Sequence, residues 1–229
     1  MSEIDSERQA KLSEIPSDLD VDPDTRTDRL IGLSDGIFAF AMTLLAVNVD
    51  LPRLASNLTP AEVTSSVLEL APDFLIYVTS FLLVGVYWQV HRRTFHFIKA
   101  SDAALTWLNL LQLMCVAFLP VAAGLFDTHT NVSIVIVVYA ATLLSIGLVG
   151  LLLWRHAVSA KLMVENLHPI YIDYYFFRGR VTITIYVLML FVGIIAPEYA
   201  QLVLLLMFIY PFLQRIFRFL YRNKYVEQT

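Results

Sequence analysis

Six long runs of apolar residues, separated by shorter polar segments, dominate the pattern of the chain. Each run is long enough to cross a bilayer as an α-helix, which takes about 20 residues. The alternating pattern over about ten residues that marks a membrane β-barrel is absent from the sequence. The pattern predicts an all-α, polytopic membrane protein with six transmembrane helices, at about 29–51, 72–98, 103–125, 132–155, 180–197 and 199–222.

Polar segments bound this six-helix unit, which we place at residues 28–222. Residues 1–27 form an acidic tail, and the first 28 residues together hold nine acidic and three basic side chains. Such a segment has too little apolar surface to offset the entropy lost on ordering, so we expect it to be disordered. Residues 223–229 form a short C-terminal tail.

Lysine and arginine residues fall almost entirely on one side of the predicted membrane. With the N-terminus inside, the inner segments hold 15 of the 16 basic residues, and the outer side holds only Arg53. Basic residues accumulate on the cytoplasmic side, so both termini are predicted to be cytoplasmic in a cell membrane. We expect membrane lipids to be partners of the inner basic residues, and we expect no nucleic acid partner.

The segment Thr59–Glu62 predicts a short helix ahead of the second span. It reads Thr-Pro-Ala-Glu, which supplies a capping hydroxyl, a proline at the first helical position and a glutamate at the third. We expect the chain to bend at Pro72, where this short helix leads into the span.

The patterns that carry enzyme chemistry are absent from the sequence. It contains no Gly-x-Ser-x-Gly motif, no His-Glu-x-x-His motif and no paired aspartates within the spans. No group of histidine, cysteine and carboxylate residues has zinc spacing, and the single Cys115 excludes an intramolecular disulfide. We therefore expect a protein that is not an enzyme and that holds no metal or cofactor.

The first helix opens with charged and polar residues, Arg29, Ser34, Asp35 and Gly36. A carboxylate near a membrane span is costly unless it faces protein or water, which makes Asp35 a candidate functional residue. Alternatively, Asp35 lies at the interface near the helix N-terminus, where the dipole favours an anion. Arg29 is six positions before Asp35, so the two do not share a face, and Arg29 needs a partner elsewhere.

Polar residues also interrupt the second and third apolar runs. Trp88, His91 and Phe95 are spaced three and four apart and so lie on one face of the second helix. Their alternative role is that of ordinary interfacial anchors, with tryptophan in the aromatic belt. Asn109 and Gln112 are three apart in the third helix, where buried amides usually hydrogen-bond another helix.

Together these motifs resemble those of the transmembrane protein 175 potassium channel family. The family motif Arg-x-x-x-Phe-Ser-Asp at the start of helix 1 reads Arg29-Leu-Ile-Gly-Leu33-Ser34-Asp35 here, with leucine replacing phenylalanine. The resemblance extends from residue 27 to about residue 222. The supporting motifs in the second and third helices are Trp88-x-x-His91-x-x-x-Phe95, Asp102…Asn109-Leu110 and Phe118-Leu119-Pro120.

The resemblance implies a cation channel through which potassium ions pass. Bacterial members with one six-helix repeat assemble as homotetramers, in which four copies of helix 1 line a central pore. This chain has one repeat, so the expected partner is itself, in a tetramer. No Thr-Val-Gly-Tyr-Gly filter is present, so selectivity has to come from side chains on helix 1. The family's pore line falls on Phe40, Thr43, Leu44 and Val47.

These four positions form one helical stripe, at i, i+3, i+4 and i+7. Such a stripe predicts a hydrophobic constriction that gates by dewetting, with Thr43 hydroxyls as the only polar ligands. Phe40 is bulkier than the isoleucine or leucine usual in the family, so its ring either rotates aside or limits conduction. The alternative for this stripe is simple apolar packing within the bundle.

The resemblance assigns the start of helix 1 to a structural network beneath the pore, formed by Arg29, Ser34, Asp35 and Gly36. We hypothesise that Arg29 and Asp35 pair with residues of the second and third helices and so clamp helix 1. The partners expected there are Trp88, His91 and Asn109.

The alternative function is a secondary transporter that uses Asp35 as its proton or cation coupling site. Against this alternative, the chain lacks an inverted repeat and lacks mid-membrane helices broken by glycine or proline. A dimer could not supply four pore helices, so oligomer size would distinguish the two functions.

Overall fold

The computed structural model describes residues 23–47, 59–128, 132–204, 206 and 210–226, and we describe the protein from these ranges. Within them the chain is helical almost throughout, and β-pairing is limited to one isolated bridge between Ile98 and Met163. The helices are α2 (Pro23–Val47), α3 (Pro60–Glu69), α4 (Ala71–His96), α5 (Ala103–Thr128), α6 (Ser133–Ser159), α7 (Pro169–Ile195), the 3-10 helix η2 (Pro197–Tyr199), α8 (Ala200–Leu204) and α9 (Tyr210–Val226).

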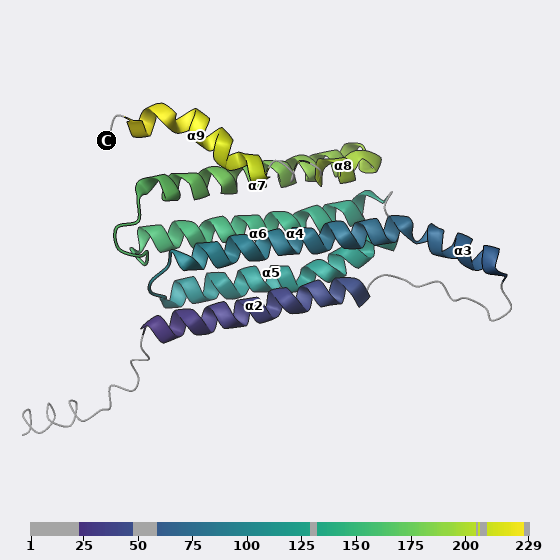
Figure 1. The fold of residues 1–229 in the computed structure, drawn as a ribbon, viewed down its shortest axis with the longest axis horizontal. Helices are drawn as coiled ribbons and strands as arrows, with labels where there is room; N and C mark the ends of the chain where they lie inside the picture. Colours follow the sequence, from purple (N-terminus) through teal and green to yellow (C-terminus); the bar gives the residue numbers. More distant parts are fainter. Residues whose placement is uncertain (1–22, 48–58, 129–131, 205, 207–209, 227–229) are drawn as a thin grey trace, which may run out of the picture.

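The long helices α2, α4, α5, α6 and α7 lie side by side along one axis, each antiparallel to the one before it (Figure 1). The closest packing is of α6 against both α5 and α7, and α2 contacts α5 and α4. The start of α2 therefore lies at the same end of the bundle as the α4–α5 and α6–α7 connections. This end carries the basic residues that predict a cytoplasmic location, and we call it the basic end.

Five segments within the described ranges are long and apolar enough to cross a membrane, which confirms the all-α membrane fold that the sequence predicts. The sixth predicted span, 199–222, falls on η2, α8 and α9, and residues 205 and 207–209 of it lie outside the described part. Most of the acidic tail also lies outside the described residues, as do residues 48–51 at the end of the first predicted helix. The five segments are Thr27–Val47, Pro60–His96, Ala103–Leu125, Ser133–Ser159 and Pro169–Ile195.

The short helix α3 confirms the capping box read from Thr59–Glu62. The Thr59 hydroxyl accepts the backbone N–H of Glu62, and the Glu62 carboxylate accepts the backbone N–H of Thr59 at 2.7 Å. Leu70 separates α3 from α4. A local pattern of three residue types was sufficient here because every bond of the cap lies within four residues.

Two predicted helix starts were wrong. The first helix begins at Pro23 rather than Arg29, so the last residues of the predicted tail are helical. The fifth begins at Pro169 rather than at 180, and His168 caps it by accepting the Ile170 N–H. Hydropathy places the boundary of the fifth span after the arginines that precede residue 181. Arg178, however, is buried against the neighbouring helices.

The main core runs through the middle of the bundle, along the buried faces of α4, α5, α6 and α7 and one face of α2. Two hydroxyl contacts inside this core show polar groups paired with each other or with the backbone, as an apolar membrane environment favours. The hydroxyls of Ser80 and Tyr139 lie 3.2 Å apart, and the Tyr87 hydroxyl donates to the Leu143 carbonyl at 3.0 Å. A second, smaller cluster lies towards the basic end and comprises Leu30, Phe95, Ile98, Leu105, Leu153 and Ala157.

Asp102 ties two connections together at the basic end. One of its oxygens accepts the Leu105 N–H at 2.7 Å and so caps α5, and the other lies 2.8 Å from Nε2 of His156. Burial raises the pKa of Asp102, but the hydrogen bonds from Leu105 and His156 outweigh it and hold this pKa below its ordinary value. The carboxylate therefore stays ionised at neutral pH and anchors α5 to the end of α6.

Replacing Gly193 by alanine is expected to destabilise the fold by about 1–3 kcal/mol, the usual cost of overpacking a tight contact. An added Cβ would lie 2.5 Å from Cγ2 of Ile136, where α7 approaches α6. Thermal unfolding of the purified protein measures the effect. The matched control is Gly85→Ala, because an added Cβ there meets nothing within 4 Å. Equal changes in Tm for the two variants would contradict the close contact.

Candidate functional site

Helix α2 has two faces that differ sharply in burial. One face packs inside the chain, and its Ser34, Phe38, Ala41 and Leu45 are each at most 2% exposed. The other face is open along its length. It carries Gly32, Leu33, Gly36, Ala39, Phe40, Thr43, Ala46 and Val47, all exposed.

The predicted pore line falls on this open face. Phe40 is 63% exposed and Val47 is 77% exposed, whereas Leu44 is half-buried at the edge of the face. The Thr43 hydroxyl donates to the backbone carbonyl of Phe40 at 2.8 Å. Since its proton is used within the helix, the Thr43 oxygen can act only as an acceptor for a cation or a water on the open side.

The buried face of α2 is held by a chain of hydrogen bonds across three helices. Nε2 of His91 on α4 lies 2.8 Å from Oδ1 of Asn109 on α5, and Nδ2 of Asn109 donates to Oγ of Ser34 at 3.1 Å. The Ser34 hydroxyl in turn donates to the Leu30 carbonyl at 2.7 Å. This direction of donation requires a proton on Nε2 of His91. We call these three side chains, His91, Asn109 and Ser34, the anchor chain.

The anchor chain is almost completely removed from solvent. Asn109 and Ser34 are 0% exposed and His91 is 4% exposed. Aromatic rings enclose the imidazole, since Phe95 stacks on it with ring centroids 4.6 Å apart and Phe38 packs at 5.4 Å. The hydrogen bonds of the anchor chain therefore fix the rotation of α2 relative to α4 and α5.

Asp35 is held separately, next to the anchor chain. The indole N–H of Trp88 on α4 donates to Oδ1 of Asp35 at 2.7 Å. The guanidinium carbon of Arg92, one turn further along α4, lies 5.6 Å from the centroid of the Trp88 ring. The half-buried carboxylate is thus bound to a helix of the same chain rather than presented on the open face of α2.

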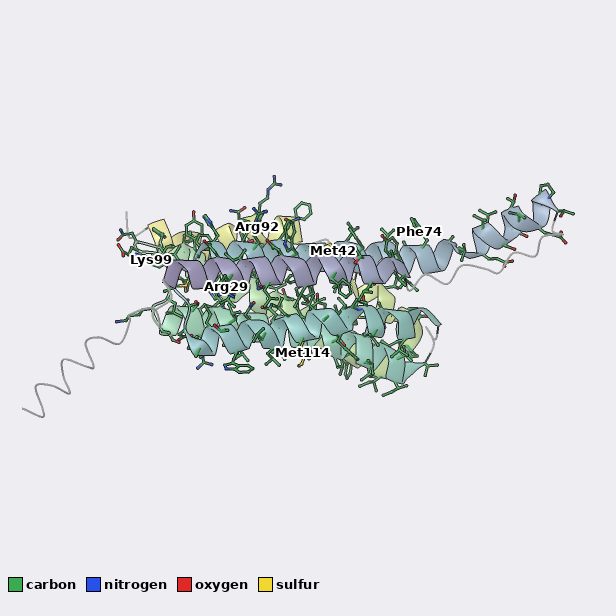
Figure 2. All side chains as sticks on the ribbon, turned by 90° about the horizontal axis from the view of Figure 1, so that it is seen from below. Arg29, Met42, Phe74, Arg92, Lys99 and Met114 are labelled. Carbon is green, nitrogen blue, oxygen red and sulfur yellow. The ribbon has the colours of Figure 1, made fainter. Side chains whose placement is uncertain are left out.

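The structure brings together five of the seven residues predicted for the network: Ser34, Asp35, Trp88, His91 and Asn109. Arg29 lies outside these contacts. Its side chain is exposed near the start of α2 (Figure 2), and in the described part of the chain no ion pair joins it to a carboxylate. Gly36 lies on the open face, where an added Cβ would meet nothing within 4 Å.

Two notable residues were missed by the sequence analysis. Arg178 was interpreted only as one of the basic residues of the inner surface, yet it is 8% exposed and lies among α4, α5 and α6 residues. Trp154, 2% exposed, lines the same region. The only sequence signal was a helical spacing of Tyr171, Tyr175 and Arg178, which continues α7 backwards from the apolar run.

The fold and this site define an all-α polytopic membrane protein whose first spanning helix is anchored on one face and open on the other. Residues 29–120 match the family described as endosomal/lysosomal potassium channel TMEM175. A potassium channel of Chamaesiphon minutus is 33% identical over 145 residues, which cover 62% of this chain and 71% of that relative. The chain belongs to the TMEM175 family, a family of ion channels.

Two further similarities agree with this membership. A potassium channel of Streptomyces collinus is 30% identical over 132 residues, which cover 56% of this chain and 63% of that protein. The crystal structure of a lysosomal potassium-selective channel TMEM175 homolog from Chamaesiphon minutus superposes with a TM-score of 0.71 and 28% identity. That superposition covers 81% of this chain and 96% of the homolog.

Proposed function

We propose that this protein is a potassium-permeable channel that conducts ions passively through a central pore formed by α2 of four identical subunits. Relatives from two bacteria carry the name potassium channel, and the similar solved structure is of a potassium-selective channel. The observation that carries the proposal is the open face of α2. It is the face that the chain's own helices leave uncovered, and it contains Phe40, Thr43 and Val47 of the pore line inferred from the resemblance, with Leu44 at its edge.

Small residues on the open face favour close approach of other α2 helices. Gly32 and Gly36 are four apart, and an added Cβ at either meets nothing in the same chain. Such small-xxx-small spacing lets helix backbones approach each other in membranes. Phe40 and Val47 would then project towards the axis as rings of apolar side chains, which close a pore by excluding water.

Thr43 supplies the one hydroxyl ring on this proposed pore line. Because the hydroxyl proton is bound to the Phe40 carbonyl, the ring would present oxygen lone pairs to a passing ion. Four such oxygens can replace part of the hydration shell of the ion. They bind it weakly, so the ion can leave the site and pass through the pore. We assign selectivity to Thr43 together with the width set by Phe40.

The contacts of Asp35 support a positioning role rather than that of a transporter's coupling site. The indole of Trp88 occupies one carboxylate oxygen at 2.7 Å, and neighbouring Ser34 belongs to the anchor chain. A coupling carboxylate has to bind and release its ion as access alternates. We therefore assign Asp35, Trp88 and the anchor chain to holding α2 in its orientation.

We also propose that the basic end of the bundle lies in the cytoplasm, with the protein in the cell membrane. Figure 2 shows Arg29, Arg92 and Lys99 towards this end and Phe74 towards the other. Exposed basic residues at this end can bind anionic lipid headgroups, each with about 1 kcal/mol of attraction near the surface. They are Arg29, Arg92, Arg93, Lys99, Arg155, Lys161, Arg180 and Arg215.

Reconstitution in liposomes tests the proposed function. We expect a potassium gradient alone to drive fast, non-saturating flux, with less flux when sodium replaces potassium. Cross-linking of the purified protein is expected to stop at the tetramer. Slow, saturating flux that requires a proton or sodium gradient would instead support the transporter alternative, and a dimer as the largest species would exclude a four-helix pore.

A further inference from the structure

A cavity of about 70 Å³ lies between α4, α5, α6 and α7; its lining is mostly apolar with a few polar side chains, and none of the residues that line it comes from α2. One water requires about 10–15 Å³ of such volume, so the cavity has room for a few waters or one small hydrated ion. Besides Tyr87 and Tyr175, the polar side chains around it belong to His91, Thr94, Gln112, Trp154, Arg178 and Thr182.

Trp154 leaves a buried hydrogen-bond donor at this cavity. Its side chain is 2% exposed, and its Nε1 has no hydrogen-bond partner in the described part of the chain. An indole N–H is a donor only, so an acceptor has to satisfy it. Buried donors without acceptors are rare because they lose their bond to water, and each one calls for an explanation.

Arg178 brings a positive charge to the same cavity. Its guanidinium carbon lies 5.8 Å from the centroid of the Tyr175 ring, and that ring stacks on Trp154 with centroids 4.5 Å apart. An arginine stays charged in proteins and has five N–H donors, so contacts that it makes elsewhere do not exhaust it. No aspartate or glutamate is among the described residues that line the cavity.

Two of the other lining groups use their hydroxyl protons elsewhere. The hydroxyls of Thr94 and Thr182 donate to the carbonyls of Val90 and Arg178, each at 2.9 Å. The indole N–H, which has no hydrogen-bond partner, and the charged guanidinium are therefore the donors that an occupant would engage. A site with two strong donors, one positive charge and no carboxylate selects an acceptor with negative charge.

We propose that this cavity binds a small monovalent inorganic anion of the halide class, which accepts hydrogen bonds from Nε1 of Trp154 and from the guanidinium of Arg178. The cavity volume excludes a bulky organic anion, and the positive charge of Arg178 disfavours the permeant cation. The anion would lie within the subunit, separate from the open face of α2. The proposal does not depend on the proposed conduction pathway.

Halide-dependent stability of the full-length protein in detergent tests this site. Potassium chloride or bromide replaces potassium gluconate at constant ionic strength, so only the anion changes. We expect Tm to rise with halide concentration and to saturate, because a ligand that binds only the folded state stabilises it. An identical Tm in all three salts over the whole range would overturn the proposal.

Two matched variants assign the effect to the cavity. Trp154→Phe keeps an aromatic ring, smaller than the indole, but removes the N–H, and we expect the half-saturating halide concentration to rise about tenfold or more. Trp107→Phe makes the same change on α5 at a side chain that is 72% exposed, and it should leave the halide response unchanged. An unaltered halide response in Trp154→Phe would show that the indole N–H does not bind the anion.

Crystals of the unmodified protein grown in bromide give a direct test that does not rely on a variant folding. An anomalous peak within hydrogen-bond distance of Nε1 of Trp154 is expected. If the cavity shows ordered water and no anomalous peak at saturating bromide, the cavity is hydrated rather than an anion site, and the proposal fails.

Discussion

Replacing Asn109 by leucine is expected to lower the free energy of unfolding by about 2–3 kcal/mol and to reduce the amount of folded protein. A single interhelical hydrogen bond in a membrane protein contributes only about 0.6 kcal/mol on average. Asn109, however, joins two partners from two other helices, and its removal leaves Nε2–H of His91 buried without an acceptor. A buried donor left in this way costs about 1–3 kcal/mol.

Gln112→Leu is the matched control for this prediction. Gln112 lies one turn further along α5, is also buried, and makes one long bond of 3.4 Å to the Ile146 carbonyl. The same change from amide to leucine should therefore cost less than about 1 kcal/mol in lost hydrogen bonding. Chemical unfolding in detergent measures both variants. Equal losses would mean that the anchor chain contributes no more than any buried amide.

Part of this anchoring was predicted from the sequence, chiefly through the family resemblance. A polar side chain in an apolar helix has few alternatives to another helix as a partner. The resemblance added a network at the start of helix 1, in which Arg29 and Asp35 were expected to pair with Trp88, His91 and Asn109. The sequence did not indicate which of these side chains hydrogen-bond to each other. Ser34 rather than Asp35 bonds Asn109, and Asp35 bonds Trp88, because these pairings depend on how far α2 is rotated against its neighbours.

The errors have a common physical origin in tertiary packing. Arg29 was expected in the network, but its position six residues before Asp35 places it on a different face, where it is exposed. Arg178 was treated as the edge of a span, although burial between helices lets a charged residue continue one. Hydropathy along one chain contains neither the helix rotations nor the neighbours that decide such cases.

Replacing Phe40 by alanine is expected to raise potassium flux through liposomes about tenfold or more. On the proposed pore line four Phe40 rings would form the narrowest apolar section, and truncation admits water where the rings exclude it. A barrier lower by only about 1.4 kcal/mol is sufficient for a tenfold increase. A potassium-sensitive dye assay measures the flux. The variant is compared with the unmodified protein at an equal protein-to-lipid ratio.

Phe191→Ala distinguishes this constriction from a general loosening of the protein. Phe191 on α7 is 60% exposed and Phe40 is 63% exposed, so the two substitutions remove similar exposed rings from different helices. If α2 lines the pore, Phe40→Ala raises flux and Phe191→Ala does not. If both variants raise flux equally, the increase is a leak through a destabilised bundle. If neither does, Phe40 lies away from the conduction path, and the open face of α2 has to be reassigned to contacts with lipid or with another subunit.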